Sequence, residues 1–315
     1  MKLEIISPGL LSTIQDLGRF GYMDSGFSPS GAMDAFSARL ANILVGNSQG
    51  EGVIEMTAVG ITARFCCSSV IAVTGADMSP EINGKKIEMY KSIPVSAGDV
   101  LSMKNASNGM RAYLAVACGF DIEPVMGSLS TNLKCAVGGF RGRKLKAGDL
   151  IPLRRCCEIT YIGERHFKPR NVFSNTVTVR AVPGPQDDYF SISELEKFFS
   201  SKYKASAESD RMGIRLDGES VCSIDGVDII SDGIVTGSVQ IPPSGKPIVM
   251  MADRQTTGGY AKIATVINAD LKYLAQLRAG DTVRFEKISQ AQAEKINKSE
   301  QKFFKRLERG FLFAD

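Results

Sequence analysis

The sequence contains very little histidine and no tryptophan. His166 is the only histidine among 315 residues. A mechanism that needs two histidines, such as a histidine metal cluster, is therefore excluded, and a Ser-His-Asp triad would have to use His166. His166 lies in a charged segment, residues 163–171, where we expect it to be an exposed linker residue. Polar chemistry must be carried by Asp, Arg, Thr, Gln and Tyr side chains, and we expect no metal site.

The sequence also lacks long hydrophobic runs and any strong imbalance of charge. Because no run of about 20 apolar residues occurs, we expect no transmembrane helix. The start of the chain has no apolar segment behind basic residues, so we expect no secretory signal. The 38 basic residues face 34 acidic ones, which is too balanced for an electrostatic nucleic-acid binder. These absences predict a soluble globular protein that binds neither membranes nor nucleic acids.

Zinc-binding spacing is missing from the cysteines. The chain has seven cysteines, an odd number, and no two of them form a Cys-x-x-Cys motif. Two pairs are adjacent in sequence, at residues 66–67 and 156–157, and neighbours in a strand point to opposite faces. We therefore expect free, mostly buried thiols in a reducing cytoplasm.

The sequence is rich in short strands separated by turn residues. It has 31 glycines and 12 prolines, and apolar runs such as residues 70–73, 112–116 and 177–182 end within a few residues at Gly, Pro, Asn or Asp. This pattern predicts a mainly β fold with a few short helices. The expected helices cover residues 33–44, 194–199, 268–277 and 290–304.

Candidate N-terminal caps precede two of these helices. Ser30 is a candidate cap for the first helix, with Asp34 as an acidic residue in its first turn. Ser193 precedes the second helix, and Glu196 follows it by three residues, as in a capping box. The last helix is rich in Lys, Glu and Gln, so we expect a solvated amphipathic tail helix.

A turn pattern recurs three times and suggests the domain organisation. Residues 96–101, 146–151 and 278–283 each place Ala-Gly-Asp before two strand-prone residues, a pattern typical of a tight turn. Three such turns indicate repeated β-barrel units, and the charged segment around His166 is the best boundary. We predict a first β-barrel domain at residues 1–165, a second at 166–288 and a solvated helical tail at 289–315.

Five segments hold more Gly, Ser, Thr and charged residues than strand connections need. They are residues 12–22, 28–34, 127–131 together with 138–143, 209–216 and 253–260. The last is the most informative, because hydroxyls, an amide and a phenol cluster beside a Gly-Gly pair that lets the backbone approach a ligand. Such a loop can hold an oxyanion or a carbonyl oxygen. The structural alternatives are a hairpin turn for the last segment, a helix cap for the second and an ion-paired turn for the fourth.

Together these segments resemble one protein family. The resemblance is carried by residues 13–21 (TIQDLGRFG), 30–34 (SGAMD), 40–47 (LANILVGN), 74–77 (TGAD), 111–116 (RAYLAV), 209–213 (SDRMG) and 252–260 (ADRQTTGGY). The chain is similar to the allophanate hydrolase subunit 2 family, also called the biotin-dependent carboxyltransferase family, which includes the C-type subunits of 5-oxoprolinase. The chain departs from the family at Leu129, where an Arg is usual, and at Ala261, where a Pro is common.

The resemblance implies a fold, partners and an activity. The implied fold is two tandem cyclophilin-like β-barrels. The implied activity is hydrolysis of a cyclic amide: the ATP-dependent opening of 5-oxo-L-proline to L-glutamate. The implied partners are a subunit-1 (B-type) protein and a lactam-utilisation (A-type) subunit. We assign ATP to the complex, because this sequence has no P-loop.

Two alternatives stay open within the resemblance. One is the carboxyltransferase component of a urea or amide carboxylase or of an allophanate hydrolase system, which would involve biotin. This chain has no Met-Lys-Met biotin-attachment motif of its own. The other is a regulatory antagonist that binds a kinase-inhibitor partner without catalysis.

The resemblance and the side-chain chemistry together select ten candidate site residues. The candidate catalytic residues are Asp34, Thr257 and Tyr260, with Asp34 as the acid or base. The candidate substrate-binding residues are Gln15, Arg19, Ser30, Arg211, Gln255, Thr256 and Gly258. The arginines would bind a carboxylate, and residues 255–257 would polarise a carbonyl of a small amide or lactam. We expect these groups to converge on one cleft between the two barrels.

Overall fold

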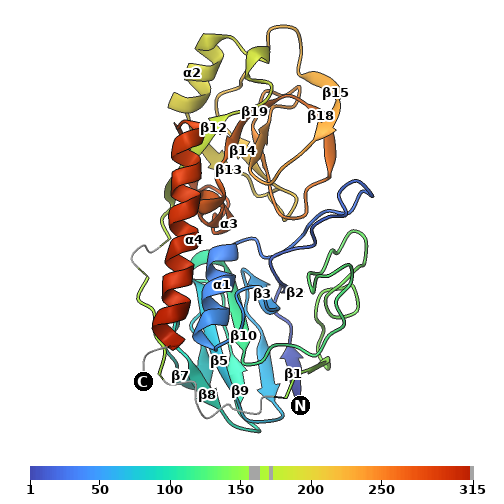
Figure 1. Cartoon of the computed structure of the whole chain (residues 1–315), viewed down its shortest axis with the longest axis vertical. Coiled ribbons are helices and arrows are strands. Elements are labelled where there is room, and N and C mark those ends of the chain that lie inside the picture. Colours follow the sequence, from blue (N-terminus) through green and yellow to red (C-terminus); the bar gives the residue numbers. More distant parts are fainter. Residues whose placement is uncertain (156–163, 170–172, 313–315) are drawn as a thin grey trace. The chain divides into compact units, whose positions relative to one another are not determined.

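The chain divides into two compact units that are both mainly β (Figure 1). The computed structural model describes residues 1–155, 164–169 and 173–312, so Cys156 and Cys157 lie outside the described residues. The first unit contains residues 1–20, residues 30–173 and the chain from residue 304 onward. The second unit contains residues 21–29 and 174–303.

The first unit is built from two antiparallel sheets. A six-stranded sheet has the order β11-β1-β4-β9-β6-β7, and a five-stranded sheet has the order β2-β3-β10-β5-β8. The strands are β1 (Lys2–Ser7), β2 (Leu11–Gln15), β3 (Val53–Thr57), β4 (Thr62–Phe65), β5 (Ser69–Asp77), β6 (Glu81–Ile82), β7 (Lys85–Lys86), β8 (Ile93–Val95), β9 (Val100–Ser102), β10 (Asn108–Val116) and β11 (Leu150–Pro152). Side chains of both sheets, such as Ile54 and Leu101, are fully buried in one core.

The described strands of this unit do not close into a single barrel. The edge strand β7 consists of two exposed lysines, and charged, very short edge strands resist further pairing. The mainly β prediction is thus confirmed for the first unit, while a closed barrel is found in the second unit.

Helix α1 (Ala35–Leu44) begins where the sequence predicts a helix, but its cap is different. The carboxylate of Asp34 accepts a hydrogen bond from the N–H of Ser37 at 2.9 Å, so Asp34 is the N-cap. Ser30 and Gly31 have φ values of 55° and 95°, and they form the left-handed turn that precedes the helix. The assignment of the cap to Ser30 was therefore wrong.

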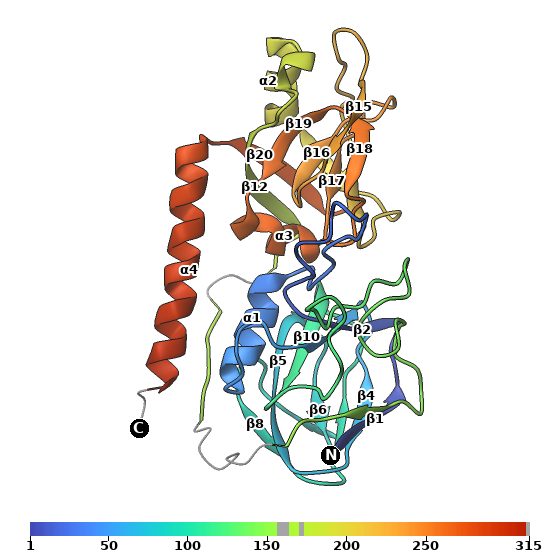
Figure 2. The same ribbon diagram turned by 45° about the vertical axis from the view of Figure 1, so that its right-hand side comes forward.

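The second unit contains a closed seven-stranded barrel with the ring order β12-β19-β16-β17-β14-β13-β20. A parallel pairing of β12 with β20 closes the ring, and β15 pairs with β18 in a separate two-stranded sheet (Figure 2). The strands are β12 (Thr176–Pro183), β13 (Lys202–Ala205), β14 (Gly213–Asp217), β15 (Asp228–Gly233), β16 (Ser238–Gln240), β17 (Ile248–Met250), β18 (Thr257–Tyr260), β19 (Lys262–Val266) and β20 (Thr282–Lys287).

The helices of the second unit lie near their predicted positions. They are η2 (Asp187–Tyr189), α2 (Ile192–Ser200), η3 (Asn268–Asp270) and α3 (Leu271–Ala275). The cap of α2 is Ser191, whose hydroxyl accepts from the N–H of Glu194 at 3.3 Å, and not the predicted Ser193.

The last helix, α4 (Gln290–Leu312), is longer than predicted and is not solvated along its whole length. Phe304 is completely buried; its ring lies 5.0 Å from that of Phe36, and the guanidinium of Arg39 lies 3.7 Å from its centre. Ala293 is also buried. The helix is thus amphipathic, as expected, but its apolar positions are buried, so the expectation of a solvated tail does not hold at Ala293 and Phe304.

The cysteines differ most from expectation. Cys66, Cys135 and Cys222 are free but exposed, Cys67 is free and half-buried, and Cys118 is disulfide-bonded. The expectation of free thiols is therefore confirmed for the four free cysteines and wrong for Cys118, and the expectation of burial is wrong for the three exposed ones. His166 is exposed, as predicted for a linker residue.

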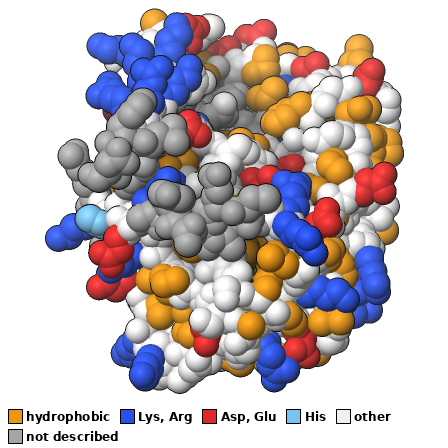
Figure 3. Space-filling view, turned by 60° about the horizontal axis from the view of Figure 1, so that its bottom comes forward, with side chains coloured by type: hydrophobic (Ala, Val, Ile, Leu, Met, Phe, Trp, Pro, Cys, Tyr) orange, Lys and Arg blue, Asp and Glu red, His pale blue; other side chains and the backbone are white. Residues whose placement is uncertain are grey.

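Charge is mixed on the surface. Figure 3 shows a face on which basic and acidic side chains are both present. Within the described part of the chain, no helix has the length and apolar character needed to cross a membrane.

Candidate functional site

The candidate site residues fall into two groups, one in each unit. The first unit holds Gln15, Arg19, Ser30 and Asp34, and the second holds Arg211, Gln255, Thr256, Thr257, Gly258 and Tyr260. The convergence of the two groups on one cleft stays a prediction. Inside each group the geometry separates side chains that are bonded within the protein from side chains that face solvent.

Gln15 ends strand β2 and is completely buried. Its Nε2 donates to the carbonyl oxygen of Thr131 and to Oγ1 of Thr13, both at 3.0 Å. Its Oε1 accepts from the N–H of Gly31 at 3.2 Å. Gln15 therefore ties β2 to two loops, and its amide is used inside the protein.

Arg19 is also buried, with 1% of its surface exposed. Its Nε donates to the carbonyl of Val125 at 3.0 Å and its Nη2 donates to the carbonyl of Ser130 at 2.8 Å. A Cβ on Gly138 would lie 2.5 Å from Nη2, so this glycine allows the backbone to approach the guanidinium. Arg19 thus stabilises the loop at residues 125–131 by binding two of its backbone carbonyls.

Asp16, which is not among the ten candidates, is the centre of this network. Its carboxylate accepts from the N–H of Gly18 at 2.8 Å, from Oγ of Ser128 at 2.8 Å, from the N–H of Leu129 at 2.6 Å and from Oγ of Ser130. The side chain of Leu129 packs into the hydrophobic core. At the position where the family usually has Arg, this chain therefore has a core residue.

Asp34 is 1% exposed and its carboxylate is occupied by the cap of α1. It accepts from the N–H of Ser37 at 2.9 Å and from its Oγ at 2.6 Å. The N–H of Asp34 donates to the phenol of Tyr113, which donates to the carboxylate of Glu55, both within 2.9 Å. Burial, and then the charges of Glu55 and Asp34, raise the pKa of Tyr113 well above its ordinary value.

Ser30 differs from its neighbours in the first group. It is buried, with 6% of its surface exposed, and its hydroxyl has no hydrogen-bond partner among the described residues. Its left-handed φ of 55° fixes the turn in which the hydroxyl sits.

In the second unit, Arg211 forms a two-pronged ion pair with Asp253. Nε lies 2.7 Å from Oδ2 and Nη2 lies 3.1 Å from Oδ1, and both side chains are almost buried. Such a fork is the geometry in which Arg binds a carboxylate, and here the carboxylate belongs to the protein. This agrees with the ion-paired turn that the sequence left open for this segment.

The segment at residues 255–260 is the exposed group. Residues 257–260 form β18, which pairs with β15 so that Gly258 lies opposite Asp232. The side chains of Gln255, Thr257 and Tyr260 are exposed, and Thr256 is half-buried. A strand, and not a tight hairpin loop, therefore presents the hydroxyl of Thr257 and the phenol of Tyr260, and the amide of Gln255 lies just before it.

Two buried polar residues close to this strand were missed from the sequence. Gln240 on β16 and Lys262 on β19 are 3% and 2% exposed, and they lie opposite each other in the barrel. The Nε2 of Gln240 donates to the carbonyl of Tyr260 at 3.4 Å. A signal for Lys262 existed, because it stands two residues after the motif, but a Lys in a short strand usually faces solvent.

Arg254 is a further buried polar residue, and it belongs to the motif at residues 252–260. Its Nε donates to the carbonyl of Ile234 at 3.0 Å, and the hydroxyl of Ser28 donates to the carbonyl of Arg254. Burial lowers the pKa of Arg254 to about 10. Arg254 thus helps to anchor the loop at residues 21–29 within the second unit.

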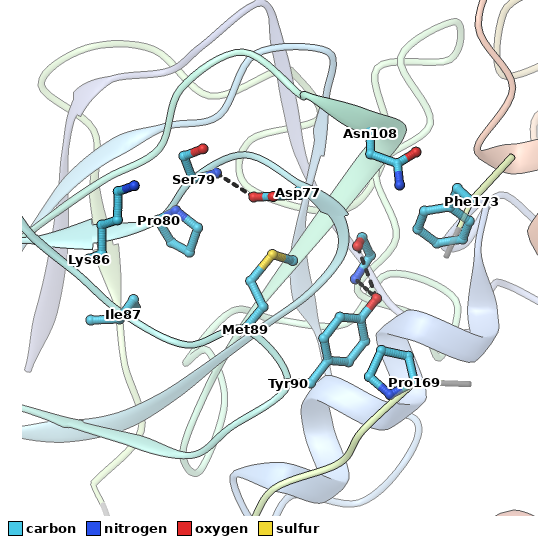
Figure 4. Close-up of a pocket in the computed structure, with 11 residues that line it drawn as sticks. Asp77, Ser79, Pro80, Lys86, Ile87, Met89, Tyr90, Asn108, Pro169 and Phe173 are labelled. Carbon is cyan, nitrogen blue, oxygen red and sulfur yellow. Dashed lines mark hydrogen bonds between the residues drawn. The ribbon is translucent and has the colours of Figure 1, made fainter. Parts of the chain in front are cut away.

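A pocket of about 410 Å³ lies in the first unit (Figure 4). Its walls include Asp77, Met89, Tyr90, Asn108 and Phe173, and none of the ten candidate residues lines it. The phenol of Tyr90 both donates to and accepts from the backbone of Gly75, within 3.1 Å. No cluster of three or more His, Cys, Asp or Glu side chains in the described ranges is arranged to hold a metal ion.

Comparisons with known proteins agree with these motifs. The model of the "Carboxyltransferase domain, subdomain A and B" family matches residues 25–287. The chain is 38% identical over 305 residues to the C-type subunit of 5-oxoprolinase from Escherichia coli, covering 97% of each chain. It is 37% identical over 308 residues to the corresponding 5-oxoprolinase subunit of Haemophilus influenzae, covering 98% of each.

A solved structure extends the comparison to the fold. The crystal structure of K. lactis urea amidolyase matches with a TM-score of 0.90 and 30% identity, over 97% of this chain but only 20% of the amidolyase chain. Nearly the whole of this chain therefore has the fold of one part of that larger protein. The chain belongs to the family of carboxyltransferase domains built from subdomains A and B, as a full-length homologue of the C-type subunit of 5-oxoprolinase.

Proposed function

We propose that this chain is the C-type subunit of a 5-oxoprolinase that opens 5-oxo-L-proline to L-glutamate with the use of ATP. The observation that carries the proposal is the match to the Escherichia coli protein, which spans 97% of both chains at 38% identity. We propose a subunit-1 (B-type) protein and a lactam-utilisation (A-type) subunit as the partners, with ATP used by the complex. We further propose that both units are cyclophilin-like and that the protein works in the cytoplasm.

We propose that β18 and the residue pair before it face the substrate. Gln255, Thr257 and Tyr260 are exposed, so their polar groups are available to a ligand. The hydroxyl and amide donors would stabilise negative charge on the lactam oxygen as the ring opens. The phenol of Tyr260 is the group that would transfer a proton.

We propose a different role for most of the other candidates. The side-chain donors of Gln15, Arg19 and Arg211 already bind loop carbonyls or a protein carboxylate. The carboxylate of Asp34 caps a helix. Such residues position loops, so their loss would lower the amount of folded protein more than the rate of the folded enzyme. Ser30 is the exception, because its buried hydroxyl is unpartnered among the described residues and fits a ligand contact.

Reconstitution of the complex tests the proposal. Glutamate release from 5-oxoproline is measured with and without ATP for the wild type, Thr257→Val and Tyr260→Phe. Loss of one charge-stabilising donor lowers kcat by about 100-fold or more. Thr178→Val and Tyr189→Phe, at equally exposed positions of the same unit, are the matched controls and keep wild-type rates. A complex without ATP-dependent turnover refutes the function, and full activity of both site variants refutes the site.

A second candidate function is carboxyl transfer. It is favoured by the TM-score of 0.90 to K. lactis urea amidolyase over 97% of this chain. The chain spans only 20% of that protein, so a biotin carrier and a biotin carboxylase would have to come from partners. Carboxylation of urea by the chain together with such partners, in place of 5-oxoproline hydrolysis, would favour this candidate.

A further inference from the structure

A buried lysine follows the strand that carries the exposed motif by two residues. Lys262 is the first residue of β19, and its side chain is 2% exposed. Its Nζ lies 2.8 Å from the carboxylate of Asp232, whose side chain is 55% exposed. Asp232 sits opposite Gly258 in the β15–β18 sheet, so the ion pair links the barrel to the motif strand. The ammonium is thus buried while its counter-ion stands at the surface.

Amide groups surround the same place. Gln240 lies opposite Lys262 across the β16–β19 pairing and is 3% exposed. A Cβ on Gly258 would lie 2.8 Å from Nε2 of Gln240 and 3.3 Å from Nε2 of Gln255. Two amide nitrogens therefore lie beside Gly258 of β18, together with Cδ1 of the buried Ile234, which would be 2.6 Å from the same Cβ.

The energetics suggest that this charge is retained for a reason other than stability. The buried ammonium loses its hydration, and attraction to a carboxylate that is itself half in water offsets that cost only in part. The pair Lys246–Asp217 in the same unit shows the ordinary arrangement, with side chains 50% and 54% exposed. The ammonium of Lys262 is instead buried near the amide of Gln240. Its partner Asp232 is half-exposed and can move away into solvent.

We propose that Lys262 binds the carboxylate of the substrate and that Asp232 is the counter-ion that this carboxylate replaces. The inference rests on the proposed function and names its substrate class: a small carboxylic acid that also carries a lactam or amide. The ammonium binds the acid group, and the amide nitrogens of Gln240 and Gln255 donate to the carbonyl oxygen. The exchange of one carboxylate for another keeps the buried charge paired throughout.

The proposal predicts opposite effects for the two members of the pair. Lys262→Met removes a charge-assisted hydrogen bond, so the KM for 5-oxoproline rises roughly 10- to 100-fold. Asp232→Asn removes the competing carboxylate, so the KM falls. Lys262→Arg keeps the cation and stays near the wild type. A purely structural ion pair would move the KM in the same direction in both variants, or not at all.

The experiment compares two probes in the reconstituted complex: 5-oxoproline and its carboxamide, 5-oxoprolinamide. The wild type prefers the acid, and Lys262→Met loses this preference, whereas Lys246→Met and Asp217→Asn keep it. An unchanged preference in Lys262→Met overturns the inference. If Lys262→Met does not fold, a raised KM in Asp232→Asn overturns it instead.

Calorimetric binding of the two probes to the full chain separates this inference from the proposed function. An inactive complex whose chain still binds the acid through Lys262 refutes the function alone. An active complex in which Lys262 is dispensable for binding refutes the inference alone.

Discussion

Replacement of Asp16 gives the strongest test of which contacts stabilise the first unit. Asp16 is 8% exposed, and its carboxylate accepts hydrogen bonds from two backbone N–H groups and two hydroxyls. Hydrogen bonds to a charged group contribute about 1.5–3 kcal/mol each, and a buried N–H left without an acceptor costs about 1–3 kcal/mol. The four bonds share one acceptor, so their contributions overlap. For Asp16→Ala we expect a loss of about 3–5 kcal/mol, a large part of a typical domain's stability.

The measurement is urea unfolding followed by circular dichroism, with hydrogen exchange to locate the change. Exchange in β10, which lies in the core of the first unit, should accelerate by the factor that corresponds to the lost free energy. Asp99→Ala is the matched control. Asp99 also accepts from a backbone N–H, at 2.8 Å, and from an amide, at 2.7 Å, but at the surface of the same unit. It should lose about 0.5–1 kcal/mol. Equal losses in the two variants would refute the claim that burial makes the Asp16 network strong.

Further predictions concern the second unit and the C-terminal helix. For Gly258→Ala we expect a folded protein with weakened substrate binding, because the new Cβ meets only movable side-chain ends; Gly75→Ala should fail to fold, since its Cβ would lie 2.4 Å from a backbone carbonyl oxygen at φ +85°. Thermal unfolding shows whether each variant folds, and the KM of Gly258→Ala reports its substrate binding. Burial raises the pKa of Tyr203 from 10.0 to about 12, so the folded state retains a proton that the unfolded state loses. Stability therefore falls as the pH rises from 10 toward 12, and the urea midpoint of Tyr203→Phe should fall less. Phe304→Ala should lose about 3 kcal/mol in urea unfolding and half-buried Phe303→Ala clearly less, and similar losses would contradict the packing of the helix end.

Local patterns predicted the β class and the approximate positions of the helices. Strand runs and turn residues act over a few neighbours, so the sequence contains that information directly. The helix caps show the limit of this local information. Ser191 and Ser193 have similar capping propensity, and Ser30 and Asp34 are both good caps, so the choice depends on tertiary structure. Asp34 becomes the cap because the left-handed backbone of Ser30 makes the preceding turn.

The candidate site was predicted less completely than the fold. Gln15, Arg19 and Arg211 carry the right chemistry for a ligand, but the same groups also satisfy buried carbonyls and a buried carboxylate. Sequence alone does not separate these two uses, because both require a polar side chain in a Gly-rich loop. Lys262 was missed for the opposite reason: its burial depends on its place in the closed barrel, opposite Gln240, which local sequence does not encode.

Burial divides the motif residues into two classes that fail in different ways when they are changed. Residues of the first kind, such as Gln15 and Asp34, already have protein partners, so a substitution leaves buried groups unsatisfied and lowers stability. Residues of the second kind, such as Thr257 and Tyr260, have solvent as their neighbour, so a substitution costs the fold little. A ligand contact needs a polar atom that the protein has not already used. The exposed motif strand meets that requirement, and Lys262 would meet it once a substrate carboxylate displaces Asp232. The loops of the first unit, apart from the hydroxyl of Ser30, do not.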